Sequence, residues 1–444
     1  MASKKLVFLG IIASSDNLKE LPISFGFLSV EDGKITRKGT LAEFKKLEKE
    51  YVFDDFEVTR MSNSQFLMPG LIDCHTHAPQ FPNLGLGLDR PLLEWLDQYT
   101  FPLERRYSDV DFAAVVYDKV VKRLIENGTT TACYFGSLHL EGTLKLAESV
   151  VKHKQRGLVG KVSMNIENHC GYYNNTQQEL KDVETFIETV LDYKNDLVQP
   201  VVTPRFAVSC DSELMTGLAC LAKKYGCRIQ SHISENTKEI EHVLKNNPGC
   251  ENYGEVYDRC EVLHNMCIMA HAVHLTDDEI RLMRSKGVSV AHCPASNTRL
   301  RSGLCPVRKY LQRNIRVGLG TDVSGGDSAS MLDAMRRSMD VSTHLELLGN
   351  SDYALSWREV FYLATLGGAK ALNLDDKIGS LEVGKDFDAL LVDVYGAASP
   401  IEEFELEPAA QCATAVVQRF VFAGDDRNLR RVYVKGHLLK DLTS

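Results

Sequence analysis

Two histidines one residue apart follow an apolar run in residues 67–80, LMPGLIDCHTHAPQ. His75 and His77 would project from one face of a β-strand, because side chains at positions i and i+2 point the same way. Imidazole is the commonest metal ligand in proteins. The pair therefore predicts part of a metal site, although thirteen histidines in 444 residues also produce such a pair by chance.

Further candidate ligands follow other apolar runs that resemble strands. His232 and Glu235 lie in IQSHISEN, His271 lies in IMAHAVHL, and Asp322 lies in GLGTDVSGG. Chance would place one or two such side chains at strand ends. Their joint placement there favours a single site assembled from several strands.

The elements that must position these residues alternate between short apolar runs and amphipathic helical patterns. Eight strands are predicted, at residues 71–77, 129–135, 158–164, 198–206, 228–234, 267–274, 288–293 and 315–321. Between them, SELMTGLACLAKKYG predicts a helix that ends at Gly226, and Thr276 with Glu279 forms a capping box for a helix that ends at Gly287. This alternation predicts a (β/α)₈ barrel, whose chemistry lies at the C-terminal ends of its strands.

The two ends of the chain have a different pattern, with strands and tight turns such as SVEDGKIT and RVYVKGHLL. We expect residues 1–67 and 377–444 to build one small composite β-domain, and residues 68–376 to form the barrel. The N-terminal MASKKLVFLGIIASSD superficially resembles a signal peptide, but its short apolar run is equally a buried strand. We predict the strand.

Composition excludes some functions. The net charge of −9, with no basic tract, argues against a nucleic-acid partner, and no apolar run approaches the roughly 18 residues of a membrane span. The twelve cysteines lie mostly in apolar segments without a regular framework, which is typical of reduced thiols. We therefore expect a cytoplasmic protein.

Several longer stretches together resemble the amidohydrolase superfamily and, within it, the guanine deaminases. They are LMPGLIDCHTHAPQ, PLLEWLDQYTFPLE, ENGTTTACYF, VTPRFAVSC, QSHISEN, AHCPASN and GLGTDVSGG. The resemblance covers nearly the whole chain, and TFPLE, TPRF and SHISEN look specific to the guanine deaminases. It implies a zinc-dependent conversion of guanine to xanthine and ammonia in purine catabolism, a barrel with a composite β-domain, and a homodimer.

The residues are consistent with one zinc ion per chain, held by His75, His77, His232 and Asp322 with water in the remaining position. Binuclear relatives carry a carboxylated lysine at the end of strand four, where this chain has Thr-Pro-Arg-Phe at 203–206. Lys161 lies in the middle of strand three, which is the wrong place. A single metal is the better interpretation.

Zinc lowers the pKa of its bound water to about 7. Asp322 is expected to accept that water's proton, and Glu235 to protonate a ring nitrogen and the leaving amine. His271 is expected to stabilise the attacking oxygen. The other zinc deaminase design needs H-x-E with a later P-C-x-x-C, and this chain lacks the second motif.

Substrate choice is predicted to rest on Arg205 and Gln80. The arginine fork matches the O6 and N7 acceptors of guanine, and the glutamine both donates and accepts. The alternative for Arg205 is a structural salt bridge beneath the barrel mouth. Phe206 and Trp95 are candidates for packing on the purine face, although aromatic side chains are more often plain core. The charged clusters KKLEKE and ERRY are expected to be solvated helix faces.

Two other functions stay open at this point. The first is a related deaminase acting on a pterin, a triazine or another purine, with the same metal ligands and a different pocket. The second is a catalytically silent barrel that binds other proteins, and the complete set of metal and acid–base residues argues against it.

Overall fold

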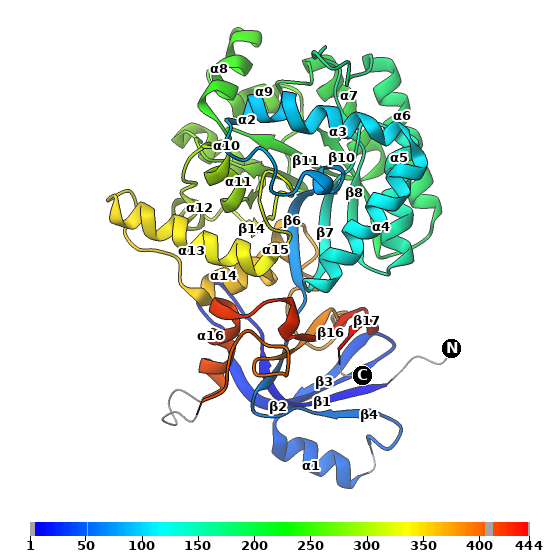
Figure 1. The fold of residues 1–444 in the computed structure, drawn as a ribbon, viewed down its shortest axis with the longest axis vertical. Helices are drawn as coiled ribbons and strands as arrows, with labels where there is room; N and C mark the ends of the chain where they lie inside the picture. The colour runs from blue at the N-terminus through cyan, green and yellow to red at the C-terminus, as the bar shows by residue number, and fades with distance from the viewer. Residues whose placement is uncertain (1–4, 51, 405–411, 443–444) are drawn as a thin grey trace.

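The computed structural model describes residues 5–50, 52–404 and 412–442. Its larger part is a barrel of parallel strands in the order β14-β13-β12-β11-β10-β8-β7-β6, with the short β9 paired to β10 (Figure 1). The strands are β6 (Leu71–His77), β7 (Thr129–Phe135), β8 (Arg156–Gly160), β9 (Val162–Ser163), β10 (Val198–Pro204), β11 (Arg228–Ile233), β12 (Cys267–His271), β13 (Ser289–His292) and β14 (Val317–Leu319).

Backbone hydrogen bonds close the barrel between its first strand and the segment after its last. The Asp322 N–H donates to the His75 carbonyl at 2.9 Å, and the His77 N–H donates to the Val323 carbonyl at 3.0 Å. Gly320 allows this approach, because a Cβ at that position would lie 2.8 Å from the Cβ of His75. The predicted (β/α)₈ barrel is confirmed.

Helices separate the strands and cover the outside of the barrel. They are α4 (Val110–Glu126), α5 (Leu140–Lys152), α6 (Thr176–Asp192), α7 (Ser212–Tyr225), α8 (Thr237–Asn246), α9 (Tyr253–Arg259), α10 (Asp277–Lys286), α11 (Pro294–Arg299), α12 (Val307–Gln312), α13 (Met331–Leu347), α14 (Trp357–Ala364) and α15 (Leu366–Ala371). Gly226 and Gly287 adopt left-handed φ values of 64° and 70° where α7 and α10 end, and Thr276 and Glu279 form the predicted capping box. Within the described ranges, no helix is both long and apolar enough to cross a membrane.

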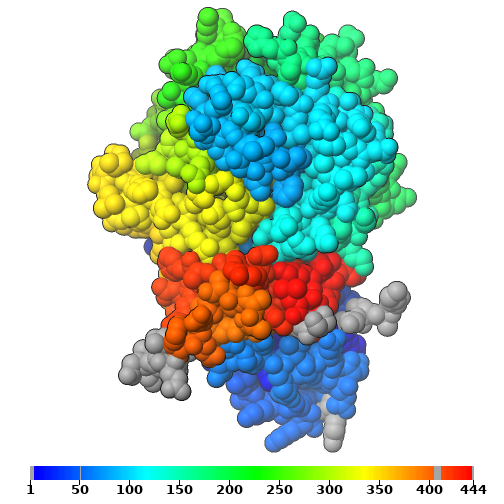
Figure 2. Space-filling view, in the orientation of Figure 1, coloured from blue at the N-terminus to red at the C-terminus, as the bar shows by residue number. Residues whose placement is uncertain are grey.

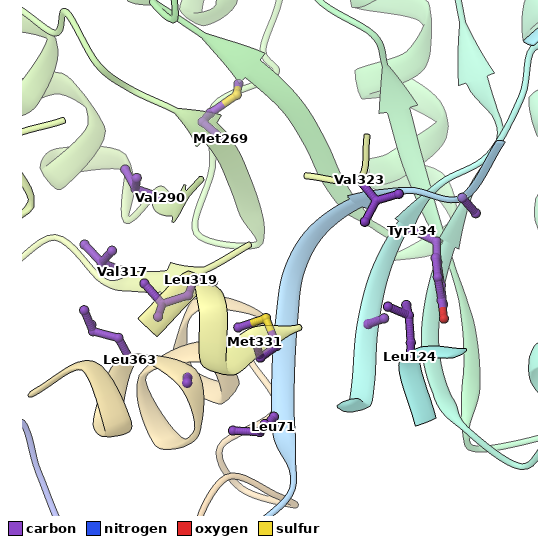
Figure 3. Packing of buried hydrophobic residues seen from close by; sticks show 14 of the residues in the cluster. Leu71, Leu124, Tyr134, Met269, Val290, Val317, Leu319, Val323, Met331 and Leu363 are labelled. Carbon is purple, nitrogen blue, oxygen red and sulfur yellow. The ribbon is translucent and has the colours of Figure 1, made fainter. Parts of the chain in front are cut away.

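The main apolar core lies between the strands and these helices. Figure 3 shows part of it, with Val317 and Leu319 of β14 near Leu363 of α14, and Leu71 at the start of β6. A second cluster joins inward-facing strand residues, such as Ile72 and Leu158, to α15 and the turns after it. The interior of the barrel is thus closed by side chains at the N-terminal ends of the strands, which leaves the opposite end for the site.

Both chain ends contribute to the smaller sheet, as predicted, in the order β17-β16-β15-β5-β1-β2-β3 with β4 paired to β1. Figure 2 shows the N-terminal segment, in blue, packed against the orange and red C-terminal segment as one lobe. Its elements are β1 (Leu6–Ala13), β2 (Ile23–Glu31), β3 (Lys34–Gly39), α1 (Leu41–Lys49), β4 (Glu57–Arg60), β5 (Gln65–Pro69), β15 (Ala389–Asp393), α16 (Ala413–Ala423), η5 (Asp426–Asn428), β16 (Leu429–Val434) and β17 (His437–Asp441). The N-terminal strand is therefore confirmed.

Two details of the sequence expectations differ from the structure. The predicted third barrel strand is interrupted at Lys161 between β8 and β9, and the predicted sixth strand, β12, ends at His271 in place of His274. The predicted domain boundary between residues 67 and 68 falls within β5, which pairs with β15 in the smaller sheet. The division of the chain into domains at residues 68 and 377 stays a prediction.

Candidate metal centre and base-binding cavity

The histidines and the aspartate predicted as ligands lie together at the C-terminal ends of the barrel strands. His77 Nε2 lies 3.1 Å from His232 Nε2, and Asp322 Oδ1 lies 3.2 Å from His75 Nε2 and 3.5 Å from His77 Nε2. Two donors that are each about 2.0–2.1 Å from one tetrahedral cation lie roughly 3.3 Å apart, which these separations match. His271 also belongs to this group.

The chain holds these side chains in fixed orientations. His232 Nδ1 donates to the Arg205 carbonyl at 2.6 Å, and His271 Nδ1 donates to Asn297 Oδ1 at 2.8 Å, so the Nε2 atom of each faces the site. His75 Nε2 is buried and has no hydrogen-bond partner of normal geometry in the described part of the chain. Such an arrangement of oriented and unpaired imidazole nitrogens is suited to a metal ion.

Backbone conformation also directs two of these residues. His271 and Asp322 have φ values of 70° and 47°, in the left-handed region, where a non-glycine residue is strained. Asp73 supports this end of the barrel, since its carboxylate accepts from the Thr321 hydroxyl at 2.5 Å and from the Thr321 N–H at 3.0 Å. The strand-end geometry is therefore fixed by contacts as well as by the barrel.

Burial and neighbouring charges separate the pKa values of the site. Burial, with further repulsion from neighbouring histidines, holds the pKa values of His77 and His232 well below the usual range, so both imidazoles are neutral. Burial opposes ionisation of Asp322, but the nearby His75 keeps its pKa well below that of an ordinary aspartate. Neutral imidazoles and an ionised carboxylate are the forms that bind a divalent cation.

The pKa values of Glu235 and His271 are both raised, in contrast to those of His77, His232 and Asp322. Burial raises the pKa of the Glu235 carboxyl, against the opposing charge of His271. Burial disfavours the His271 cation, but the charges of Glu235 and Asp322 raise its pKa above the usual value. Glu235 Oε2 lies 3.4 Å from His271 Nε2, and Glu235 Oε1 accepts from the Ser302 hydroxyl at 2.9 Å.

A cavity of about 360 Å³ adjoins the metal group. The predicted substrate residues Gln80, Trp95, Arg205 and Phe206 line it, together with His77, His232, Glu235, His271, Asp322 and the apolar side chains Leu92, Leu96 and Leu300. The structure thus brings all the predicted site residues together, since His75 belongs to the same metal group.

The segment after β6 forms one wall of this cavity. It contains η1 (Ala78–Asn83), α2 (Leu92–Trp95), the π-helix η2 (Leu96–Thr100), α3 (Phe101–Glu104) and η3 (Arg105–Ser108). In Figure 1 this segment lies beyond the upper end of β6, and α2 and α3 lie across that end of the barrel. The Trp95 indole N–H donates to the Leu86 carbonyl at 3.0 Å, which fixes the ring.

Arg205 does not present a free guanidinium to the cavity. Its Nη1 donates to Glu104 Oε2 at 2.6 Å and its Nη2 donates to Glu104 Oε1 at 3.2 Å. Gln80 Nε2 also donates to Glu104 Oε1, at 2.9 Å. Arg205 therefore forms a buried ion pair and lines the cavity at the same time.

The burial of Glu104 contradicts one expectation from the sequence. The ERRY cluster was expected to be a solvated helix face, and Arg105 and Arg106 are exposed, but Glu104 has no exposed surface. The roles of Glu104, Asn297 and Ser302 were not predicted from the sequence. The first two lie in stretches that resemble the family, which was the available signal.

Lys161 and His292 are two further buried side chains near the C-terminal ends of the strands that do not belong to the metal group. Lys161 pairs with Glu179 at 2.8 Å, fully buried and away from the metal group. His292 ends β13 and is fully buried, but it does not line the cavity.

Comparison with known proteins agrees with this geometry. The profile described as the Amidohydrolase family matches residues 66–439. The chain therefore belongs to the amidohydrolase family, and several relatives that share more than 30% identity with it over most of its length are guanine deaminases.

One such relative is the guanine deaminase of Rattus norvegicus, 46% identical over 411 residues that cover 92% of this chain and 90% of the rat protein. A crystal structure of guanine deaminase from C. acetobutylicum with bound guanine in the active site superposes with a TM-score of 0.89 at 35% identity, covering 98% of this chain and 100% of that one. An adenosine deaminase from Xanthomonas campestris with bound zinc shares the fold, with a TM-score of 0.81 at 22% identity, covering 99% of this chain and 94% of that one.

Proposed function

We propose that this protein catalyses the hydrolytic deamination of guanine to xanthine and ammonia. The observation that carries the proposal is one cavity that is lined by the metal group, by an acid–base pair and by the Arg205–Gln80 pair. Relatives that are guanine deaminases, one with guanine bound, support the same substrate.

One zinc ion per chain fits the donors. His75, His77, His232 and Asp322 would hold it, and no lysine lies at the end of β10 to bridge a second ion. When bound, zinc supplies an activated water and electrostatic stabilisation of developing negative charge. The zinc found in a structural neighbour is consistent with this choice.

Recognition of guanine rests on donors that match its O6 and N7 acceptors. Glu104 takes one N–H from each Nη atom of Arg205. The guanidinium has five N–H groups in a fixed plane, so its Nε–H and a neighbouring Nη–H form a second parallel pair. That pair donates hydrogen bonds to O6 and N7, and the bound base is thereby oriented with C2 and its amine toward the metal group. Phe206 and Trp95 pack against the faces of the base.

Asp322 and Glu235 move the protons. A bond forms between the water oxygen and C2, and the bond from C2 to the amine breaks. Of the two water protons, one ends on ring nitrogen N3 and the other on the departing ammonia. The ionised Asp322 accepts one proton from the attacking water, and Glu235, whose pKa is raised by burial, delivers its own proton to N3. The proton on Asp322 then passes through Glu235 to the departing amine, and the second water proton, released as the C2 carbonyl forms, restores Glu235. His271 stabilises the charge on the attacking oxygen.

We also propose that the protein acts in the cytoplasm as a homodimer in purine catabolism. The resemblance to guanine deaminases supports the dimer. None of the twelve cysteines, all within the described residues, forms a disulfide, which is consistent with a reducing compartment.

The test is an assay of purified protein for ammonia and for the ultraviolet spectrum of the product. Guanine should give stoichiometric xanthine and ammonia, while adenine, cytosine, pterins and aminotriazines should give little. Preferential turnover of a pterin or triazine would replace guanine with that substrate. A zinc-loaded protein that is inactive on the whole panel would instead favour a binding role for the barrel.

A further inference from the structure

Glu104 is a carboxylate with no solvent exposure that touches both side chains proposed to read the base. It accepts hydrogen bonds from Arg205 Nη1 and Nη2 and from Gln80 Nε2. We propose that Glu104 is a positioning residue that sets the preference of this site for guanine, by holding Arg205 and Gln80 in one donor pattern. The proposal rests on the proposed function and adds a determinant of specificity to it.

The first effect is on the plane of the Arg205 guanidinium. Glu104 engages both Nη atoms, at 2.6 and 3.2 Å, so the carboxylate grips the end of the planar group at two points. A planar, rigid fork held at two points cannot rotate about its axis. The remaining pair of N–H groups therefore keeps one direction. The ring of Phe101, 5.1 Å from Arg205 Cζ, packs against the same group.

The second effect is on the orientation of the Gln80 amide. An ionised carboxylate only accepts hydrogen bonds, so Glu104 requires the NH₂ end of Gln80 to face it. The other end, Oε1, accepts from the Ser324 N–H at 3.2 Å. A flipped amide would place Oε1 against the carboxylate and NH₂ against a backbone donor. Glu104 and Ser324 thus leave one N–H of Gln80 for a ligand, in a defined place.

The third effect is electrostatic. Arg205 is almost completely buried, and a buried guanidinium without a counter-ion is strongly disfavoured. Glu104 supplies that counter-ion at the cavity wall, so a cationic donor can face a neutral base next to a metal group. The charge of the pair is balanced before any ligand enters.

Glu104 itself is held by the segment that follows β6. It is the last residue of α3, and Tyr107, three residues further on, donates its hydroxyl to the Pro79 carbonyl at 2.8 Å. Pro79 precedes Gln80 in η1, so this bond joins the segment that carries Glu104 to the one that carries Gln80. Gln80 and Glu104 are therefore positioned by the segment after β6, and Arg205 follows directly after β10.

The experiment compares wild type with Glu104→Gln on guanine and on 2-aminopurine, which lacks the O6 acceptor. Without the carboxylate, the Gln80 amide is free to flip and Arg205 loses its two-point grip. We expect kcat/KM for guanine to fall at least about tenfold, mainly through KM, since uniform binding is lost. The value for 2-aminopurine should change much less, and zinc content should stay at the wild-type level.

A second variant and a matched control separate this role from general stability. Glu104→Asp keeps the charge but withdraws the carboxylate by one methylene. It should also lower the ratio of kcat/KM for guanine to kcat/KM for 2-aminopurine, while its melting temperature stays near that of wild type. Glu179→Gln breaks another fully buried ion pair, with Lys161, and should lower the melting temperature without changing the substrate ratio.

Two results would overturn the proposal. One is a folded, zinc-loaded Glu104→Asp protein with the wild-type preference for guanine. The other is an equal loss on both substrates in the Glu104 variants, which would make the residue merely structural. Wild-type protein that leaves guanine intact would instead overturn the proposed function itself, so the two failures are distinguishable.

Discussion

Replacing Arg205 by lysine tests base recognition without removing the counter-ion of Glu104. A deletion to alanine would leave the Glu104 carboxylate buried and unpaired, at a cost of about 3–5 kcal/mol in stability. Lysine keeps a positive charge near Glu104 but offers a point donor in place of a fork. It retains at most one of the two proposed bonds to guanine, and losing the other costs about 1.5–3 kcal/mol. That corresponds to about 10- to 150-fold in kcat/KM.

The assay measures kcat/KM for guanine and for 2-aminopurine in both proteins. The analogue keeps N7 but lacks O6, so it makes one of the two bonds with either side chain. We therefore expect Arg205→Lys to lower kcat/KM for guanine about 10- to 150-fold and to change kcat/KM for 2-aminopurine little. Zinc content should not change. His232 is oriented by the backbone carbonyl of Arg205, and that carbonyl is present whatever side chain occupies position 205.

A matched control uses another buried arginine that forms two ion pairs. Arg156 donates to Asp388 and to Asp386 at 2.9 Å each, and thereby joins β8 to the segment that precedes β15. Arg156→Lys should lower the melting temperature while leaving the ratio between the two substrates unchanged. An Arg205→Lys protein that loses activity equally on both substrates, with normal zinc content and stability, would refute recognition of O6 by this side chain.

Three further predictions follow from the site and from the domain contact. Purified protein should hold about one zinc per chain by elemental analysis, and His75→Ala or Asp322→Ala should lose metal and activity together; two tightly bound ions would contradict the single-metal assignment. Glu235→Gln should retain zinc but lose about 10²- to 10⁴-fold in kcat, and near-normal turnover would show that another group carries the proton. Arg156→Leu should reduce the free energy of unfolding in urea by about 3–5 kcal/mol without changing KM for guanine; wild-type stability would show that the domain contact contributes little.

The sequence predicts the barrel well because its strands are buried on both faces. The predicted ranges 71–77 and 129–135 coincide with β6 and β7, whose residues are all buried. The predicted end of the sixth strand is three residues too late. The chain turns at His271 and Ala272, which have φ values of 70° and 50°, and neither position carries the glycine that most often marks a left-handed turn.

The proposed metal ligands could be predicted from the sequence because the parallel barrel brings the C-terminal ends of its strands to one rim. Strand periodicity and residue type then suffice to place His75, His77 and Asp322 together. Glu104 carries neither signal. It lies in a short helix beside two exposed arginines, and its partner Arg205 is 101 residues away. Apart from the family resemblance of the TFPLE stretch, only the folded contact distinguishes it from a solvated carboxylate.

Arg205 connects the two halves of the site through different atoms. Its carbonyl accepts from His232 Nδ1 and thereby directs Nε2 toward the metal group, while its side chain pairs with Glu104 at the cavity wall. A change of side chain leaves the first contact in place and alters the second. Metal content and base preference should therefore vary independently among Arg205 and Glu104 variants. The contact of Arg205 with the metal group is made by its backbone carbonyl, which side-chain substitutions leave in place. We therefore expect loss of zinc only in variants of the proposed ligands.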